Sequence, residues 1–366
     1  MGVSGRVDRG FERVRDTFLE TIPTGGGAFA ATVDGRMVVD LWARGAGGGQ
    51  WDEDTAAIRF SGTKGVVATV LLVLADRGRL DLDAPVASVW PEFAQGGKDD
   101  ITIAQLAAHA AGLPAVVQRL TQDDLADPVQ IAALLAAQEP MLPPGTPSYH
   151  AITWGWLCGE VVRRVEGRSV GEVVRELFGD LEIRIGVDPA EPFAGRIARI
   201  APSPDYRLGA FLAEDPDPRL EGVYGNPAIG AEDWGDPALL KPEIAAANGV
   251  ATARAMAELY GRLVCGALVG RDTLARAHTP EAQGDDPLTG RPLRFGPTGY
   301  ELAGTPSAVG PPADAFGHTG TGGGSHGGWP SLRTGFSYLT ARLRPETVDA
   351  RARSLLDTLH DAVTSR

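Results

Sequence analysis

The 366-residue chain contains little cysteine and little lysine. Its two cysteines, Cys158 and Cys265, both fall inside apolar helical patterns. Their number excludes a disulfide framework and predicts two buried free thiols. Only three of the 34 basic residues are lysines, and the formal charge at pH 7 is −13. Because no basic tract offsets this negative charge, nucleic acid and anionic membranes are not expected as partners.

Long hydrophobic runs are also missing. The longest, residues 65–75, is too short to span a bilayer. Residues 1–15 alternate glycine, arginine and aspartate without an apolar stretch, so we expect no secretion signal and a soluble cytoplasmic protein. The sequence also lacks a cluster of histidine, cysteine and carboxylate at metal-site spacing, so neither a metal nor another cofactor is predicted.

The composition that remains is ordinary for a globular protein. With 43% hydrophobic and 22% charged residues, the chain can bury a large core. Two short β-forming runs, 28–33 and 37–43, flank Asp34 and Gly35 and predict a hairpin. Other predicted helices and strands follow from periodicity. The helices are 8–21, 66–74, 128–138, 154–166, 250–264 and the segment from Pro345 to Val363, and the strands are 315–320 and 335–341.

Strands at both ends of the chain, with helices between them, predict an α+β fold. We expect an antiparallel sheet flanked by helices in a domain built from residues 1–80 and 241–366. Residues 81–240 would form an inserted, mostly helical domain and the other wall of a cleft. Within it, residues 186–240 are rich in proline and glycine and are interpreted as long ordered loops.

A serine and a lysine stand three residues apart where a helix is predicted to begin. These residues are Ser61 and Lys64, and Gly78 is placed to end the helix. Side chains three residues apart share a helix face, so the amine could take a proton from the hydroxyl. In the plainer alternative, Ser61 only caps the helix and Lys64 is a solvated lysine of its first turn.

Two further segments extend this motif. Tyr149 follows a proline-rich turn, and His318, Thr319 and Gly320 lie in a predicted strand. Together with Ser61-x-x-Lys64, they resemble the three motifs of the serine β-lactamase and penicillin-binding protein superfamily, and most closely the class C-like family VIII carboxylesterases and related acyltransferases. The resemblance implies a β-lactamase/transpeptidase-like fold. It extends from about residue 10 to 345 and includes the segments 80–86, 109–113, 144–151, 155–162 and 248–251.

The resemblance also implies roles for individual residues. Ser61 would be the acylated nucleophile, and Lys64 and Tyr149 would share the acid and base work, with coupled titrations that leave the base unassigned. The backbone N–H groups of Ser61 and Thr321 would form the oxyanion hole. Residues expected to border the substrate are His318, Thr319, Gly320 and Trp154.

Two positions depart from the family pattern. The third motif usually begins with lysine, whereas this chain has His318, which is mostly neutral at pH 7. Class C β-lactamases carry asparagine two residues after the tyrosine, and here the residue is Ala151. Both departures weaken the case for β-lactams. We therefore expect a serine hydrolase acting on a small ester or amide; the alternatives are a biosynthetic acyltransferase and a non-catalytic acyl- or peptide-binding homologue.

Several signals have plainer interpretations. Residues 323–327 match G-x-S-x-G, the nucleophile elbow of α/β-hydrolases, but their glycine flanks favour a flexible turn beside the site. His318 could be a strand histidine with only a structural partner. Trp154 could simply pack in the core, as tryptophan on a helix usually does.

Overall fold

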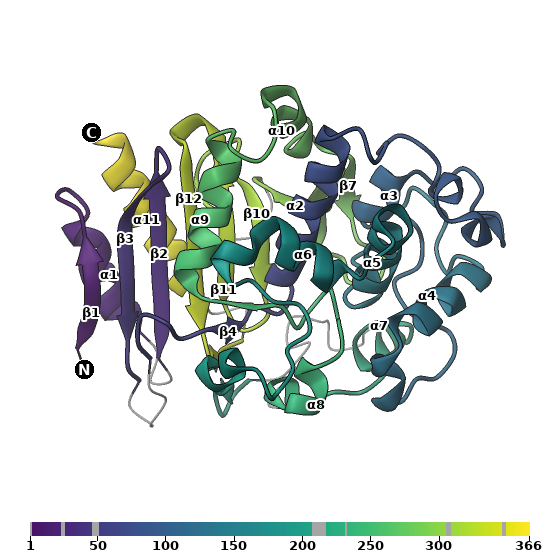
Figure 1. Cartoon of the computed structure of the whole chain (residues 1–366), viewed down its shortest axis with the longest axis horizontal. Helices are drawn as coiled ribbons and strands as arrows, with labels where there is room; N and C mark the ends of the chain where they lie inside the picture. The colour runs from purple at the N-terminus through teal and green to yellow at the C-terminus, as the bar shows by residue number, and fades with distance from the viewer. Residues whose placement is uncertain are drawn as a thin grey trace.

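The computed structural model describes residues 2–22, 26–45, 51–206, 217–230, 233–304, 309–345 and 349–366. In these residues an antiparallel sheet has nine strands, in the order β1-β3-β2-β12-β11-β10-β9-β8-β7 (Figure 1). Strand β2 pairs with β12 along its whole length, so both ends of the chain meet in one sheet. The strands are β1 Val3–Val7, β2 Gly27–Val33, β3 Arg36–Ala43, β7 Ala282–Asp285, β8 Pro292–Phe295, β9 Glu301–Leu302, β10 Phe316–Gly320, β11 Gly324–Trp329 and β12 Thr334–Thr340.

Helices cover both faces of this sheet. On one face, α1 (Glu12–Thr21) and α11 (Arg351–Thr364) pack together over an apolar layer that includes Phe18 and Leu355. On the other face, α9 (Ala253–Val264) lies along β2 and β12. Both termini lie at the same end of the molecule (Figure 1).

The helix that follows Ser61 is buried on all sides. It is α2 (Gly62–Asp76), and its residues from Gly62 to Leu74 are all buried. A helix that is apolar around its whole circumference belongs in a core, which explains why its sequence shows little polar periodicity. Gly78 has φ +66°, the left-handed conformation of a glycine that ends a helix.

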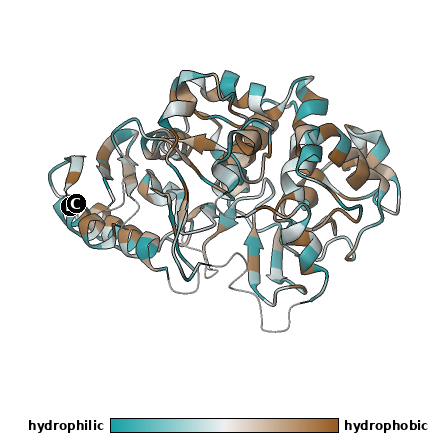
Figure 2. Cartoon of the chain, turned by 90° about the horizontal axis from the view of Figure 1, so that it is seen from below, coloured by the Kyte–Doolittle hydropathy of each residue, from teal (hydrophilic) through white to brown (hydrophobic). Residues whose placement is uncertain are grey.

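The middle of the chain is largely helical. Most of its helices share one apolar core with α2, whereas Leu220 and Val223 of α7 belong to a separate small cluster. Figure 2 shows hydrophobic residues along the helices on both sides of the molecule. The helices there are α3 Ile103–Ala107, α4 Pro128–Ala137, α5 Thr153–Glu166, α6 Val170–Phe178, α7 Leu220–Gly225 and α8 Pro237–Leu240; α10 Arg271–Ala277 follows α9. Short 3-10 helices cover Val86–Ser88, Pro91–Ala94, Asp123–Ala126, Gly179–Leu181, Pro192–Arg196, Asp233–Gly235 and Pro330–Leu332.

Two small ladders complete the fold. Strands β4 (Ala57–Ile58) and β6 (Val250–Ala251) are antiparallel, whereas β5 (Ala201–Pro202) and β13 (Arg342–Leu343) are parallel. The predicted α+β fold, with its antiparallel sheet and helical insertion, is confirmed. The division into domains 1–80 with 241–366 and 81–240 stays a prediction.

Some segments were predicted wrongly. Residues 186–240, predicted as loops, contain α7 and α8, and the closing helix begins at Arg351 and not at Pro345. Residues 323–327, interpreted as a flexible turn, mostly belong to β11, an inner strand of the sheet. Glycine is used here because neighbouring backbone and helices approach closely: a methyl group at Gly328 would lie 2.6 Å from a methyl carbon of Val264 in α9. The prediction of two buried thiols holds for Cys158, while Cys265 is partly exposed.

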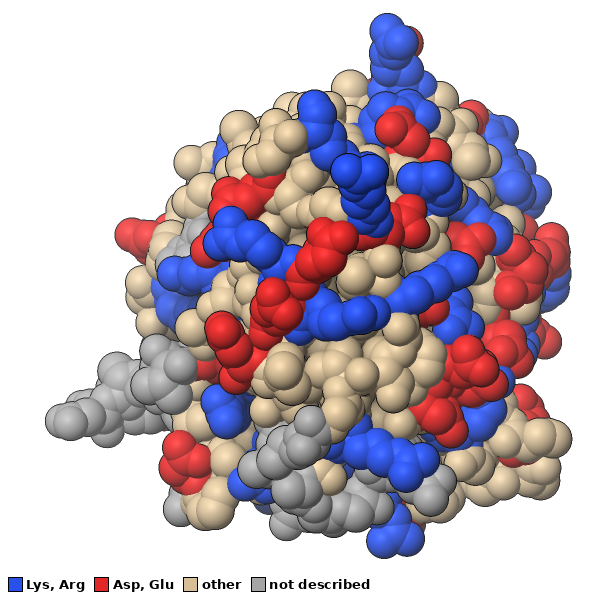
Figure 3. Space-filling model, turned by 90° about the vertical axis from the view of Figure 1, so that its left-hand side faces the viewer, with Lys and Arg blue, Asp and Glu red and all other residues tan. Residues whose placement is uncertain are grey.

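The surface mixes both signs of charge. Figure 3 shows lysine and arginine interspersed with aspartate and glutamate on the end of the molecule that carries the termini. Pairs such as Arg36 and Asp8, with an N–O distance of 3.0 Å, are exposed and contribute little to stability. Every helix in the described residues is too short or too polar to cross a membrane.

Candidate active site

Ser61 lies at the point where the chain enters α2. The preceding residue, Phe60, has φ +46°, an uncommon conformation for a side chain of that size, and it turns the backbone from β4 into the helix. Among the described residues the Ser61 hydroxyl caps no helix N–H, and it lies at the wall of a cavity. The plainer interpretation of Ser61 as a helix cap is therefore wrong.

Lys64 is completely buried one turn along the same helix. Its Nζ lies 3.2 Å from Ser61 Oγ, 2.8 Å from the carbonyl oxygen of Ala151 and 3.1 Å from that of Ala246. Burial lowers the pKa of the Lys64 amine from 10.5 to about 7, although Glu301 raises it. The amine is thus substantially neutral at physiological pH and is not the solvated lysine of the plainer interpretation.

Tyr149 brings a phenol to the same place. Its backbone N–H donates to Asp286 at 3.1 Å, and its ring contacts that of His109 with a centroid distance of 4.8 Å and an angle of 31° between the ring planes. The Tyr149 ring also lies 4.9 Å from Lys64 Nζ. Burial and the nearby Glu301 carboxylate hold the pKa of Tyr149 well above 10, although a hydrogen bond with Ser61 lowers it. The phenol is therefore protonated at neutral pH.

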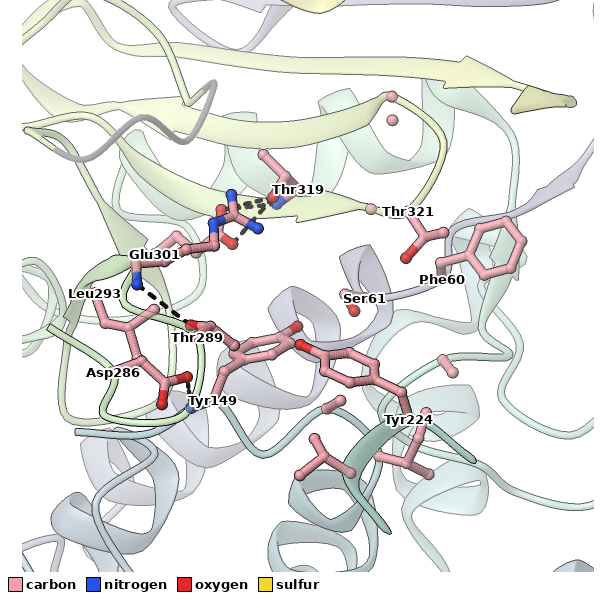
Figure 4. A pocket seen from close by; sticks show the side chains of 18 of the residues that line it. Phe60, Ser61, Tyr149, Tyr224, Asp286, Thr289, Leu293, Glu301, Thr319 and Thr321 are labelled. Carbon is pink, nitrogen blue, oxygen red and sulfur yellow. Dashed lines mark hydrogen bonds between the residues drawn. The ribbon is translucent and has the colours of Figure 1, made fainter. Parts of the chain in front are cut away.

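Ser61 and Tyr149 line a cavity of about 270 Å³, and Lys64 is buried behind Ser61. Figure 4 shows Ser61 between Tyr149 and Thr321, with Tyr224 of α7 opposite Tyr149. One wall is mainly apolar and comes largely from residues 186–240, the segment predicted to form long ordered loops. Its residues are Phe60, Leu125, Tyr206, Val223, Tyr224, Ile229 and Trp234.

The end of β10 forms the opposite wall. Thr319 lines the cavity and donates both its N–H and its hydroxyl to the Glu301 carboxylate, each at 3.0 Å. His318 alternates to the inner side of the strand, where it is fully buried. Its Nδ1 lies 2.7 Å from the Thr319 carbonyl and 3.7 Å from Glu301. Burial lowers the pKa of His318 below 6.5, so it does not supply the cation that a lysine would.

Gly320 and Thr321 bring backbone close to Ser61. A methyl group at Gly320 would lie 2.3 Å from the Arg59 carbonyl oxygen and 3.6 Å from the Gly62 nitrogen, so only glycine allows this approach. Within the described residues, neither the Ser61 nor the Thr321 N–H donates to a protein acceptor. Both residues line the cavity, which is the arrangement that an oxyanion hole requires.

Two predicted binding residues lie elsewhere. Trp154 was expected at the pocket edge but is fully buried in the core, where its indole N–H donates to the Ala107 carbonyl at 2.7 Å. His318, expected to line the pocket, lies beneath it. The sequence analysis did not predict Glu301 and Tyr224 as site residues. Neither residue belongs to a motif, so nothing in the neighbouring sequence marks it as part of a site. No group of three or more histidine, cysteine or carboxylate side chains in the described chain is placed to hold a metal ion.

Comparisons with known proteins agree with this geometry. Residues 11–360 match the family model described as Beta-lactamase. The esterase/beta-lactamase LipL of Mycobacterium tuberculosis is 36% identical over 359 residues, which cover 92% of this chain and 82% of LipL. A crystal structure of a family VIII carboxylesterase is 31% identical with a TM-score of 0.88, over 99% of this chain and 100% of that one. A penicillin-binding protein homologue from Caulobacter crescentus is 30% identical with a TM-score of 0.86, over 99% and 100% of the two chains. This chain therefore belongs to the beta-lactamase family.

Proposed function

We propose that this chain is a serine hydrolase that cleaves small esters or amides through an acyl-enzyme on Ser61. The observation that carries the proposal is the environment of the Lys64 amine. Two backbone carbonyls lie within hydrogen-bonding distance of Nζ, and Ser61 Oγ lies at 3.2 Å. A neutral amine has two N–H groups and one lone pair. When both N–H groups are donated to the carbonyls, the lone pair is left for the Ser61 hydroxyl proton.

The two perturbed pKa values then separate the acid and base roles. Lys64, with its pKa lowered to about 7, accepts the proton of Ser61 as Oγ attacks the substrate carbonyl. The oxyanion that forms is stabilised by the N–H groups of Ser61 and Thr321. Tyr149, whose phenol stays protonated, donates to the departing alcohol or amine and recovers a proton from Lys64. Water repeats the same steps on the acyl-enzyme and releases the acid.

The third motif, residues 318–320, provides no cation for a substrate carboxylate. This favours substrates that lack a carboxylate beside the scissile bond. Both donors of Thr319 already point at Glu301, and His318 contributes no cation. The cations that do line the cavity, Arg291, Arg294 and Arg353, lie on other segments than this motif. The esterase and carboxylesterase named among the relatives act on esters by their descriptions, which supports the ester assignment.

The test uses p-nitrophenyl acetate with the full-length chain. We expect a pre-steady-state burst of p-nitrophenolate and, after rapid acid quenching, a mass increase of one acetyl group on the peptide that contains Ser61. Ser61→Ala should abolish both signals. Ser88→Ala is the matched control, because Ser88 is exposed and lies outside the cavity. Full esterase activity in Ser61→Ala would overturn the proposal.

A further inference from the structure

A buried ion pair joins Asp349, which lines the active-site cavity, to Arg351, the first residue of α11. Arg351 and Asp349 expose only 3% and 2% of their side chains. The guanidinium makes two bonds to the carboxylate, Nε to Oδ1 at 2.8 Å and Nη2 to Oδ2 at 2.6 Å. This two-point geometry fixes the plane of the guanidinium, so its remaining donors have defined directions.

Those donors join the turn between β10 and β11 to the end of β12 and to β13. The second N–H of Arg351 Nη2 is shared between the carbonyl oxygens of Gly322, at 2.8 Å, and of Arg342, at 3.0 Å, while Nη1 donates to Thr340 Oγ1 at 3.2 Å. Gly322 directly follows Thr321, whose N–H is the second proposed oxyanion donor. The direction of that N–H depends on the backbone of the turn, and the Gly322 carbonyl is one of its anchors.

The turn is confined from both sides. Gly322 and Gly323 have φ +83° and +107°, conformations that favour glycine. A methyl group at Gly323 would lie 2.1 Å from Asp349 Oδ2, and one at Gly320 would lie 2.3 Å from the Arg59 carbonyl oxygen. The turn is therefore enclosed between the backbone that leads into Ser61 and the ion pair of α11.

From this arrangement we propose that Arg351 and Asp349 are positioning residues for the oxyanion hole, which hold the Thr321 N–H in the orientation that binds the developing negative charge. The proposal rests on the proposed function. It assigns catalytic importance to a helix that begins outside the three sequence motifs. Oxyanion donors act because their geometry is fixed before the reaction. If the turn moves, the Thr321 N–H stabilises the oxyanion less, while the affinity for the substrate is kept.

The experiment removes both charges together, because a single substitution would leave an unpaired buried charge. In the double variant Asp349→Leu/Arg351→Met, we expect folding to persist and kcat for p-nitrophenyl acetate to fall by about 10- to 100-fold, part of the effect of losing one oxyanion donor. KM should stay within about twofold. Burst rate and steady-state rate should fall by similar factors, because acylation and deacylation form the same oxyanion.

The matched control is Asp40→Leu/Arg254→Met. This pair also joins a helix to the sheet, with an N–O distance of 2.9 Å, but it connects α9 with β3 away from the cavity. It should leave both rates unchanged. A boronic acid that forms a tetrahedral adduct with Ser61 should lose affinity for the Asp349/Arg351 variant by the same factor as kcat/KM, and should keep its affinity for the control.

The outcomes separate the two proposals. A folded Asp349/Arg351 variant with wild-type kcat would overturn the positioning role. If that variant does not fold, Arg351→Lys decides, since it keeps a cation beside Asp349 but cannot reproduce the fixed guanidinium geometry. A kcat loss at constant KM supports the proposal, and unchanged kcat refutes it. A wild-type enzyme without a Ser61-dependent burst would instead refute the proposed function.

Discussion

Replacing Lys64 with methionine would remove the buried amine and keep most of its volume. The pKa of this amine falls from 10.5 to about 7 because burial disfavours its charged form. One pKa unit corresponds to about 1.4 kcal/mol, so a fall of this size implies that charged Lys64 costs the folded state roughly 5 kcal/mol. The methionine variant is free of that cost, although it leaves the Ala151 and Ala246 carbonyls without their donor.

The pH dependence isolates the amine from these other changes. Unfolded Lys64 keeps its proton up to a pH near 10.5, whereas folded Lys64 loses it near pH 7. Between these values, unfolding takes up a proton, so the free energy of unfolding of the wild type rises with pH. The cost of the charged amine is fully present below pH 7 and disappears as the pH approaches 10.5. Lost carbonyl hydrogen bonds in the variant do not depend on pH.

The assay is urea unfolding followed by tryptophan fluorescence at pH 7, 8 and 9. The free energy of unfolding of wild type minus that of Lys64→Met should increase by roughly 1.4 kcal/mol per pH unit over this window. In parallel, kcat/KM of the wild type should rise with pH through a midpoint near 7, as the base loses its proton. A difference in stability that does not change with pH would refute the assignment of a neutral lysine, and with it the base role.

Two further substitutions test the neighbours of Lys64. Tyr149→Phe should lower kcat by roughly 10²- to 10⁴-fold for alkyl esters and amides but much less for p-nitrophenyl esters, whose leaving group departs without a proton. An equal loss for all leaving groups, measured as kcat across an ester series, would contradict the donor role. Glu301→Gln removes a carboxylate that raises the pKa of Lys64, so the midpoint of the kcat/KM profile should move to lower pH. A shift of this midpoint to higher pH would contradict the claim that Glu301 raises the pKa of Lys64.

Local signals were sufficient for much of the fold. The hairpin turn at residues 34–35 could be predicted because its conformation depends on residues that are adjacent in sequence. The same holds for Gly78, which ends α2. Strand β11 escaped prediction because its glycines are chosen by what packs against them in three dimensions. Propensity treats glycine as a strand breaker and does not see the helix that requires it.

In the candidate site, too, features that depend on contacts between distant segments could not be predicted from the sequence. Ser61 and Lys64 could be paired from sequence because helical spacing fixes their relation. The burial that lowers the pKa of Lys64 could not be predicted, since the groups that surround its amine, such as the Ala151 and Ala246 carbonyls, come from distant segments. Trp154 was misplaced because a helix has several apolar faces and sequence does not say which one borders a cavity. Arg351 gave no signal, because its partners become neighbours only after folding.

The pairing of β2 with β12 has a consequence for synthesis on the ribosome. The hairpin of β2 and β3 emerges from the ribosome before the helical segments that follow it, whereas β12, which covers the inner edge of this hairpin, is translated only after them. Until then, that edge exposes unpaired backbone groups that could join another chain. Slowing translation just before β12 should therefore increase aggregation of this protein more than slowing it between α3 and α8, where the growing segments can bury their own apolar surface.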